Sequence, residues 1–316
     1  MTDYAQHLAQ LHAGFEAPAA IVVQAAREVT RSPIAARRRI VHGEANEVYA
    51  IAFDSGLEVI LRIARRTPGI FEKEAWAIGR CRELGVLAPE VLSIQRLQAG
   101  AEALELCFLE KLPGERLMDS LALPRETLRS IGRELGEQVG RMHSIGLGDL
   151  GDGAPFFVDD IDDTLATGPE FVRLGAAAGL REGALQAALR FYEETMAARP
   201  ALVRRLTHND LRACHVMVHD GRLSGLIDFG QASMDSAIND LAKWDFWEAP
   251  HLPVAWLEEG YGDRRLFDHD YRSRFQALRL ANALWALRWH ALTDYPGGVA
   301  RDAARIDAYL QDLRLG

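Results

Sequence analysis

Two aspartates and a histidine flank a short predicted hairpin in the second half of the chain. Asp210 and His215 precede the hairpin at residues 216–227, and Asp228 follows it. Because Asp220-Gly221 is a turn pair that reverses the chain, we expect the three side chains to meet at the open end of the hairpin. Two carboxylates and an imidazole at one edge can hold a divalent cation and accept a proton, and a purely structural hairpin needs neither.

The order and spacing of these residues match the requirements of phosphoryl transfer. This chemistry needs an aspartate that receives a hydroxyl proton, a metal ligand five residues later and a metal-binding aspartate in a D-F-G segment. The γ-phosphoryl transition state spreads negative charge over its oxygens, so divalent cations must bridge the phosphates. One such fragment is weak evidence, whereas all of them in order across a hairpin indicate a nucleotide-dependent kinase.

The residues around the hairpin resemble a known family. His208–Val218 together with Gly225–Gly230 is similar to the catalytic loop and metal motif of the aminoglycoside phosphotransferase family, small-molecule kinases related in fold to protein kinases. The resemblance implies an α+β, two-lobed, protein-kinase-like fold that uses ATP or GTP with Mg²⁺, or alternatively Mn²⁺, to phosphorylate a hydroxyl of a small molecule. It further implies that Asp210 is the catalytic base and that His215 and Asp228 hold the metal.

Further segments between residues 40 and 245 resemble the same family. The segment 43–49 resembles the loop that covers the nucleotide, and 108–114 resembles the hinge that meets the purine. The strand at 59–62 and the helix at 71–84 resemble the elements that carry a phosphate-binding cation and its acidic partner. The nucleotide-binding residues implied by these matches are Gly43, Asn46, Arg62, Glu74, Glu110 and Leu112.

The catalytic loop has two expected supports and two departures from the family pattern. His208 braces the loop in this resemblance, and Asp240 begins a D-L-A segment that supports it. Asn209 stands where the family usually has glycine, and His215 stands where it usually has asparagine. Histidine at the second position is similar to macrolide phosphotransferases, whereas Trp244–Trp247 resembles hygromycin-type aminoglycoside kinases. The resemblance therefore divides the acceptor between two precedents.

The charge composition favours some classes of binding partner over others. The 316 residues include 36 Lys and Arg and 45 Asp and Glu, a net charge of −9. This balance disfavours a nucleic-acid or anionic-membrane binder and suits a cationic acceptor, as does the acidic run at residues 159–163, although solubility explains such charge equally well. An aminoglycoside-type antibiotic is the first expectation; a macrolide or a small metabolite such as a sugar or amino alcohol is the alternative.

The start of the chain, the hydropathy and the cysteines point to one compartment. No apolar run reaches the roughly 18 residues of a membrane span, and the first residues lack the pattern of a secretory signal. Three cysteines form no disulfide or zinc framework. We expect a cytoplasmic monomer or homodimer.

The predicted elements divide the chain into two lobes. Residues 1–111 form the expected N-terminal nucleotide-binding lobe, and 112–316 form a helical C-terminal lobe that carries the catalytic loop and the substrate site. The first lobe contains a helix at 4–28, strands at 48–53, 57–63, 90–94 and 104–109, and the helix at 71–84. The second contains, besides the hairpin, helices at 126–145, 237–246, 271–292 and 299–313.

Two rival functions follow from the same residues. A metal-dependent hydrolase would use His208, Asp210, His215 and Asp228 as one ligand cluster, and it leaves segment 43–49 unexplained. A catalytically silent kinase-like binding module would have no need for the two aspartates. Zinc content separates the first rival from a kinase, and nucleotide turnover separates the second.

Overall fold

The N-terminal part of the molecule is built on an antiparallel sheet. The computed structural model describes residues 3–43, 46–65, 69–100, 102–150, 161–197 and 204–315. Five strands lie in the order β1-β2-β3-β5-β4, and buried and half-buried residues alternate along β2, as expected where one face covers a core. The strands are β1 (Ile34–Ile40), β2 (Asn46–Phe53), β3 (Glu58–Ala64), β4 (Val91–Ala99) and β5 (Glu102–Glu110). The four strands expected from the sequence are confirmed, three of them longer than expected, and β1 was not anticipated.

Helix α3 (Ile70–Glu83) joins this sheet to the rest of the molecule. Its apolar side chains recur every three or four residues and are buried, Phe71, Ile78 and Cys81 among them. The helix ends before Gly85, whose φ of +73° suits a glycine that stops a helix. One face of α3 also buries Glu74, which places a carboxylate in the interior.

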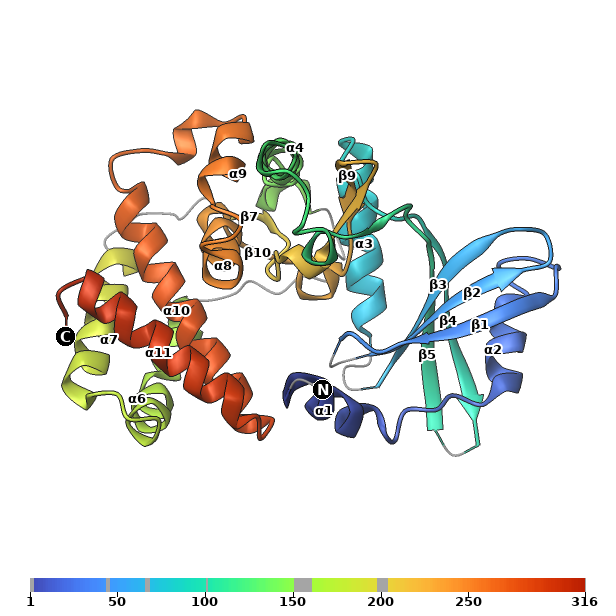
Figure 1. The fold of residues 1–316 in the computed structure, drawn as a ribbon, viewed down its shortest axis with the longest axis horizontal. Helices are drawn as coiled ribbons and strands as arrows, with labels where there is room; N and C mark the ends of the chain where they lie inside the picture. The colour runs from blue at the N-terminus through green and yellow to red at the C-terminus, as the bar shows by residue number, and fades with distance from the viewer. Residues whose placement is uncertain are drawn as a thin grey trace.

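The single helix expected at 4–28 is wrong. The segment forms two helices, α1 (Asp3–His12) and α2 (Ala19–Ala26), because Pro18 lacks a backbone N–H and is the residue before the second helix begins. Helix α1 lies between the sheet and the C-terminal helices (Figure 1). His12 Nε2 lies 2.6 Å from the Gly43 carbonyl oxygen, and the His7 ring stacks on Tyr295 at 5.0 Å, so α1 contacts both parts.

The C-terminal part is mostly helical, and the expected helices at 126–145, 237–246, 271–292 and 299–313 are confirmed with small shifts. Helix α4 buries an apolar stripe that joins the central core. Among the described residues, no helix has the length and apolar character to cross a membrane. The helices are α4 (Arg125–Met142), α5 (Ile161–Ala166), α6 (Gly168–Ala177), α7 (Glu182–Ala197), α8 (Ala237–Glu248), α9 (Ala255–Gly260), α10 (Tyr271–Leu292) and α11 (Pro296–Asp312), with short 3-10 turns η1 (Leu117–Asp119), η2 (Leu147–Asp149), η3 (Ala213–His215), η4 (Phe229–Gln231) and η5 (Arg264–Leu266).

Two small sheets lie within the helical part. The expected hairpin is β8 (Val216–His219) and β9 (Arg222–Leu226), and β6 (Glu115–Arg116) pairs with β8. Strands β7 (Arg204–Thr207) and β10 (Ser233–Ser236) form the other sheet. Together they place the residues after β7 beside the residues after β9.

The chain passes from the large sheet to the hairpin through a close backbone contact. A Cβ atom on Gly114 would lie 1.8 Å from the carbonyl oxygen of Val218, so only glycine allows the segment after β5 to approach β8 this closely. The large sheet ends at Glu110, and the next strand belongs to the hairpin sheet. A lobe boundary after residue 111 is compatible with this arrangement and stays a prediction.

Candidate active site

The catalytic loop, residues 208–215, and the start of the D-F-G segment are held side by side. The backbone N–H of Ile227 donates to the His215 carbonyl oxygen over 2.9 Å. Asn209 and Asp228 both adopt left-handed backbone conformations, with φ of 58° and 66°, a region in which Asn and Asp are enriched among non-glycine residues. The tight bends turn the residues at the open end of the hairpin toward one another.

Asp240 at the start of α8 organises the catalytic loop. This fully buried carboxylate accepts hydrogen bonds from the backbone N–H groups of His208 and Asn209, each over 2.8 Å, and from His143 Nε2 over 3.0 Å. Burial alone would raise the pKa of Asp240, but the hydrogen bond and charge of His143 hold it below its ordinary value. Asp240 thus fixes the two backbone amides immediately before Asp210.

Asp210, His215 and Asp228 meet as expected. His215 Nδ1 lies 2.8 Å from the Asp210 carbonyl oxygen, which can only accept, so Nδ1 carries a proton and Nε2 faces Asp228 Oδ2 at 3.6 Å. Burial would lower the pKa of His215, but the Asp210 carboxylate, followed by Cys214 and the Asp228 carboxylate, outweighs burial and raises it to about 10. A divalent cation between Nε2 and Asp228 would therefore replace a proton.

Arg62 on β3 links α3 to the D-F-G segment. Its guanidinium is hydrogen-bonded to Glu74 Oε1 and donates to Asp228 Oδ1 over 2.9 Å. Glu74 also accepts from the backbone N–H of Phe229 over 3.0 Å. Burial would raise the pKa of Asp228, but Arg62 and then His215 hold it below its ordinary value, so Asp228 is a carboxylate at neutral pH.

These residues fit a magnesium-bridged nucleotide. The Asp228 side chain is 41% exposed, whereas its partners Arg62 and Glu74 are almost completely buried. Mg²⁺ is usually bound through one or two protein side chains together with phosphate oxygens and water. A partly open carboxylate beside an imidazole nitrogen and a fixed guanidinium is such a partial site.

The expected nucleotide contacts outside this network are more loosely defined. Gly43 is exposed, Asn46 begins β2, and residues 44–45 of the expected loop lie outside the described residues. The backbone N–H of Glu110 is taken by the Glu90 carbonyl oxygen, whereas the Leu112 N–H has no acceptor among the described residues. The roles of Gly43, Asn46, Glu110 and Leu112 stay predictions.

The hydrolase cluster does not assemble. His208 Nε2 donates to the Ile227 carbonyl oxygen over 2.9 Å. This nitrogen is therefore not available as a fourth metal ligand beside Asp210, His215 and Asp228. Within the described ranges, no group of three His, Cys, Asp or Glu side chains has the geometry of a metal site. His208 therefore braces the hairpin end, and the four-ligand arrangement required by the hydrolase hypothesis is absent from the described part of the chain.

Two residues of α8 hold the catalytic loop and were not anticipated. Lys243 Nζ donates to the Asn209 carbonyl oxygen over 2.5 Å, and the Ala213 N–H donates to Glu248 Oε1 over 2.8 Å. Lys243 lies three residues after Asp240 and Glu248 lies eight residues after it, so all three face one side of the helix. That helical spacing from Asp240 was the available signal.

Comparison with known proteins identifies the family. The sequence profile described as "phosphotransferase enzyme family", abbreviated APH, matches residues 36–275. The chain belongs to this family. It is therefore a phosphotransferase, and the resemblance drawn from the catalytic loop is confirmed.

Similar proteins place this phosphotransferase among kinase-like folds. The aminoglycoside phosphotransferase APH(4)-Ia, in a thermostable mutant, has a TM-score of 0.67 and 20% identity over 88% of this chain and 95% of its own. The amicoumacin kinase hAmiN, solved with AMP-PNP, Ca²⁺ and Ami, has a TM-score of 0.67 and 14% identity over 98% and 96%. The KEOPS complex subunit Bud32 of Pyrococcus abyssi (strain GE5 / Orsay) is 31% identical over 41% of this chain and 67% of its own length. The α+β, two-lobed kinase-like fold is thus confirmed.

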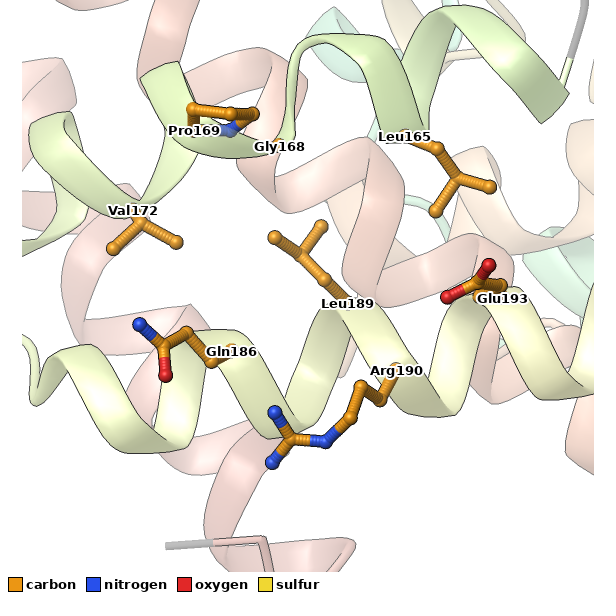
Figure 2. A pocket seen from close by; sticks show the side chains of 8 residues that line it. All are labelled: Leu165, Gly168, Pro169, Val172, Gln186, Leu189, Arg190 and Glu193. Carbon is orange, nitrogen blue, oxygen red and sulfur yellow. The ribbon is translucent and has the colours of Figure 1, made fainter.

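A cavity of about 600 Å³ lies between α6 and α7, apart from the catalytic loop. Leu189 projects between the two helices and Arg190 turns outward (Figure 2). None of the lining residues belongs to the catalytic loop or the hairpin. Of the acidic run at 159–163, Asp159 and Asp160 lie outside the described residues, and Asp163 is exposed; the role of the run in binding a cationic acceptor stays a prediction.

Proposed function

We propose that this phosphotransferase moves the γ-phosphoryl group of ATP or GTP to a hydroxyl of a small molecule, with Mg²⁺, or alternatively Mn²⁺, in the site. The observation that carries this function is the network of Arg62, Glu74, Asp228 and His215 beside Asp210. A fixed guanidinium, a metal-binding carboxylate and a partly exposed second carboxylate are the groups that phosphoryl transfer uses. His208 and Asp240 support them through the backbone.

Each residue of the network has a distinct task. Asp210 orients the acceptor hydroxyl and receives its proton. Asp228 and His215 Nε2 would hold the metal, which supplies positive charge to the phosphate oxygens when it is bound. Arg62, held by Glu74, presents its guanidinium to the phosphates in a fixed orientation, which costs no reorganisation during the reaction.

The nucleotide base would lie against the segment between β5 and the hairpin. The Leu112 N–H has no acceptor among the described residues, and a Cβ on Gly225 would lie 2.6 Å from Leu112 Cδ1. The Leu112 backbone can therefore bond a purine edge while its side chain packs on the hairpin. Gly43 and Asn46 would cover the phosphates from the opposite side, and Glu110 would contribute its carbonyl oxygen.

Three acceptor classes follow from the sequence: an aminoglycoside-type antibiotic, a macrolide, and a small metabolite such as a sugar or amino alcohol. Several solved proteins of the same fold act on antibiotics or were solved with them, hygromycin B and kanamycin among them. A net charge of −9 favours the first class, but that charge belongs to the whole surface. The side chains beside Asp210 provide a local criterion.

The test is metal-dependent transfer. The purified protein with ATP or GTP and Mg²⁺ should release nucleoside diphosphate when an acceptor is added, and ³¹P NMR should show a new phosphomonoester. Zinc analysis of the same preparation should find less than one equivalent. Stoichiometric zinc with hydrolysis of substrates that contain no nucleotide would instead support the hydrolase.

A further inference from the structure

The catalytic loop directs a second charged side chain to the same side as Asp210. Leu211 is fully buried in the central core, and the backbone at Arg212 is extended, with φ of −147° and ψ of 156°. Because successive side chains of extended chain point in opposite directions, Arg212 turns away from the core that Leu211 enters. Arg212 therefore faces away from the core, within electrostatic range of the Asp210 carboxylate.

Aromatic side chains at the end of α8 hold a group of arginines on this face. The Arg212 Cζ atom lies 4.0 Å from the centre of the Trp247 ring, and Arg301 Cζ lies 5.5 Å from the same ring. Arg305 follows Arg301 by four residues on α11, on the same side of that helix, with its Cζ 4.9 Å from the Phe246 ring. Stacking on aromatic rings fixes the orientation of a guanidinium and leaves its N–H groups available in the ring plane.

Arg212 and Arg305 differ from Arg301 nearby in making no direct contact with a carboxylate. Neither forms an ion pair within 4.0 Å in the described part of the chain, and Arg212 Nε and Arg305 Nη1 are buried there without a hydrogen-bond acceptor. Arg301, in contrast, pairs with Asp302 over 3.0 Å. The carboxylates of Asp210 and Glu248 lie within electrostatic range of Arg212, and Glu248 uses Oε1 to accept from the Ala213 backbone.

Buried donors without partners are costly, because each has lost water without gaining an acceptor. The cost is recovered when a ligand supplies oxygen acceptors, and a guanidinium fits carboxylate or phosphate oxygens in a bidentate geometry. A polyamine at the same place would meet the like charges of Arg212 and Arg305, and the carboxylate near both arginines, Glu248, already accepts from the Ala213 backbone. Arg212 thus brings a positive charge close to Asp210 in a molecule whose net charge is negative.

We propose that Arg212 and Arg305 bind an anionic group of the acceptor, so that the preferred substrate is a hydroxylated small molecule bearing a carboxylate or a phosphate. This inference rests on the proposed kinase function and narrows its acceptor class. Arg212 lies two residues from the base and orients the acceptor hydroxyl; Arg305 contributes affinity from α11. The proposal selects the metabolite class among the three acceptors above and disfavours polyamine antibiotics.

The experiment uses four sugars that share a hydroxylated ring and differ in charge: glucosamine, glucose, glucuronate and glucose 6-phosphate. Nucleoside diphosphate release is measured for each with Mg²⁺ and ATP in the intact protein and in Arg305→Met, Arg212→Met and the control Arg129→Met. Arg129 lies on α4 and is paired with Glu259 on the surface. Calorimetric titration of each protein with ATP and Mg²⁺ tests the kinase function separately.

We expect kcat/KM for glucuronate or glucose 6-phosphate to exceed that for glucose by at least about tenfold, with glucosamine lowest. The comparison of the two anions shows whether carboxylate or phosphate fits better. Arg305→Met should abolish the preference by raising KM for the anions alone, Arg212→Met should do the same and also lower kcat, and Arg129→Met should keep the preference.

Three outcomes would overturn the inference while Mg²⁺-dependent nucleotide binding is intact. These are turnover of glucosamine above the anions, turnover of none of the anions, or equal losses for all four sugars in both arginine variants. The last result would show that Arg212 and Arg305 stabilise the fold and do not bind an anionic group of the acceptor. Absence of Mg²⁺-dependent ATP binding in the unmodified protein would instead contradict the proposed function itself.

Discussion

The proposed phosphate side and acceptor side of the reaction centre differ in whether their arginines form ion pairs within the chain. On the phosphate side, Arg62 is bonded to both Glu74 and Asp228 within the chain. On the proposed acceptor side, Arg212 and Arg305 form no ion pair within 4.0 Å among the described residues, and Arg212 Nε and Arg305 Nη1 lack a hydrogen-bond acceptor there. Charges that are already satisfied hold a geometry in place before any ligand arrives, whereas unsatisfied charges gain their partner only from a ligand.

In the proposed function, this contrast separates the part of the site that performs the reaction from the part that selects the substrate. The phosphate side is built from β3, α3 and the hairpin, which pack into the central core. The acceptor side is built from one catalytic-loop residue and from helices α8 and α11, near which α1 makes its contact with Tyr295. We therefore expect substitutions on the two sides to affect different kinetic constants.

The largest effect is expected at the residue between the two sides. Asp210→Asn should lower kcat by about 10²–10⁴-fold, because the amide cannot receive the hydroxyl proton. The affinity for nucleotide should be unchanged, since Asp210 takes no part in the Arg62 network. Steady-state kinetics with calorimetry checks both, and Asp220→Asn at the exposed hairpin tip is the matched control. Comparable turnover in Asp210→Asn and the control would show that Asp210 is not the catalytic base.

The next largest effect is expected on the phosphate side. Asp228→Ala should weaken Mg²⁺-dependent ATP binding by at least about 10–100-fold, the loss seen when even an outer partner of a metal ligand is removed. It also frees Arg62 from one of its two carboxylates. The measurement is calorimetric titration with and without Mg²⁺, with Asp220→Ala alongside. Unchanged affinity that still depends on Mg²⁺ would rule out Asp228 as a ligand.

A smaller effect, on stability, is expected at Asp240. Asp240→Asn replaces a carboxylate that accepts three hydrogen bonds, so the free energy of unfolding should fall by about 2 kcal/mol at neutral pH. Because the pKa of Asp240 is lowered in the folded protein, its contribution is present above the unfolded value near 4 and is lost as pH falls through the folded value. Urea unfolding from pH 7 to pH 3 should therefore show the difference between the two proteins shrinking. If the difference in free energy of unfolding stayed constant from pH 7 to pH 3, Asp240 would not stabilise the fold as an ionised carboxylate.

The smallest effect is expected at His215. An imidazole nitrogen is a softer ligand than an amide oxygen, so His215→Asn should shift metal preference a few-fold from Mn²⁺ toward Mg²⁺. Because the pKa of His215 is raised to about 10 without metal, metal must displace its proton, and metal affinity should rise with pH from 7 to 9 in the unmodified protein only. Metal titrations at several pH values check this. Identical profiles in His215→Asn and His215→Ala and in the unmodified protein would make His215 a bystander.

Sequence patterns predicted the juxtaposition at the open end of the hairpin because the residues that meet there are local to strong signals. Asp210, His215 and Asp228 flank one hairpin, and a turn pair determines which residues meet. Arg62 and Glu74 were placed by resemblance alone, since nothing in the local sequence shows that β3 and α3 come together beside Asp228.

The acceptor side was hidden from the sequence for a physical reason. Arg212 and Arg305 are 93 positions apart, and whether an arginine is paired depends on tertiary neighbours rather than on spacing. The net charge of −9 pointed to a cationic acceptor, yet Arg212, two residues after Asp210, carries a positive charge. The break between α1 and α2 was missed because apolar spacing continues across Pro18.

The division between the two sides can be tested most directly by measuring two Michaelis constants in two variants. Arg62→Lys keeps the charge but cannot reach two carboxylates in a fixed fork, and it should raise KM for ATP by about tenfold while leaving KM for glucuronate unchanged. Arg305→Met should do the reverse. If both substitutions raise the same constant, or if Arg305→Met raises only KM for ATP, the account of a paired phosphate side and an unpaired acceptor side is contradicted.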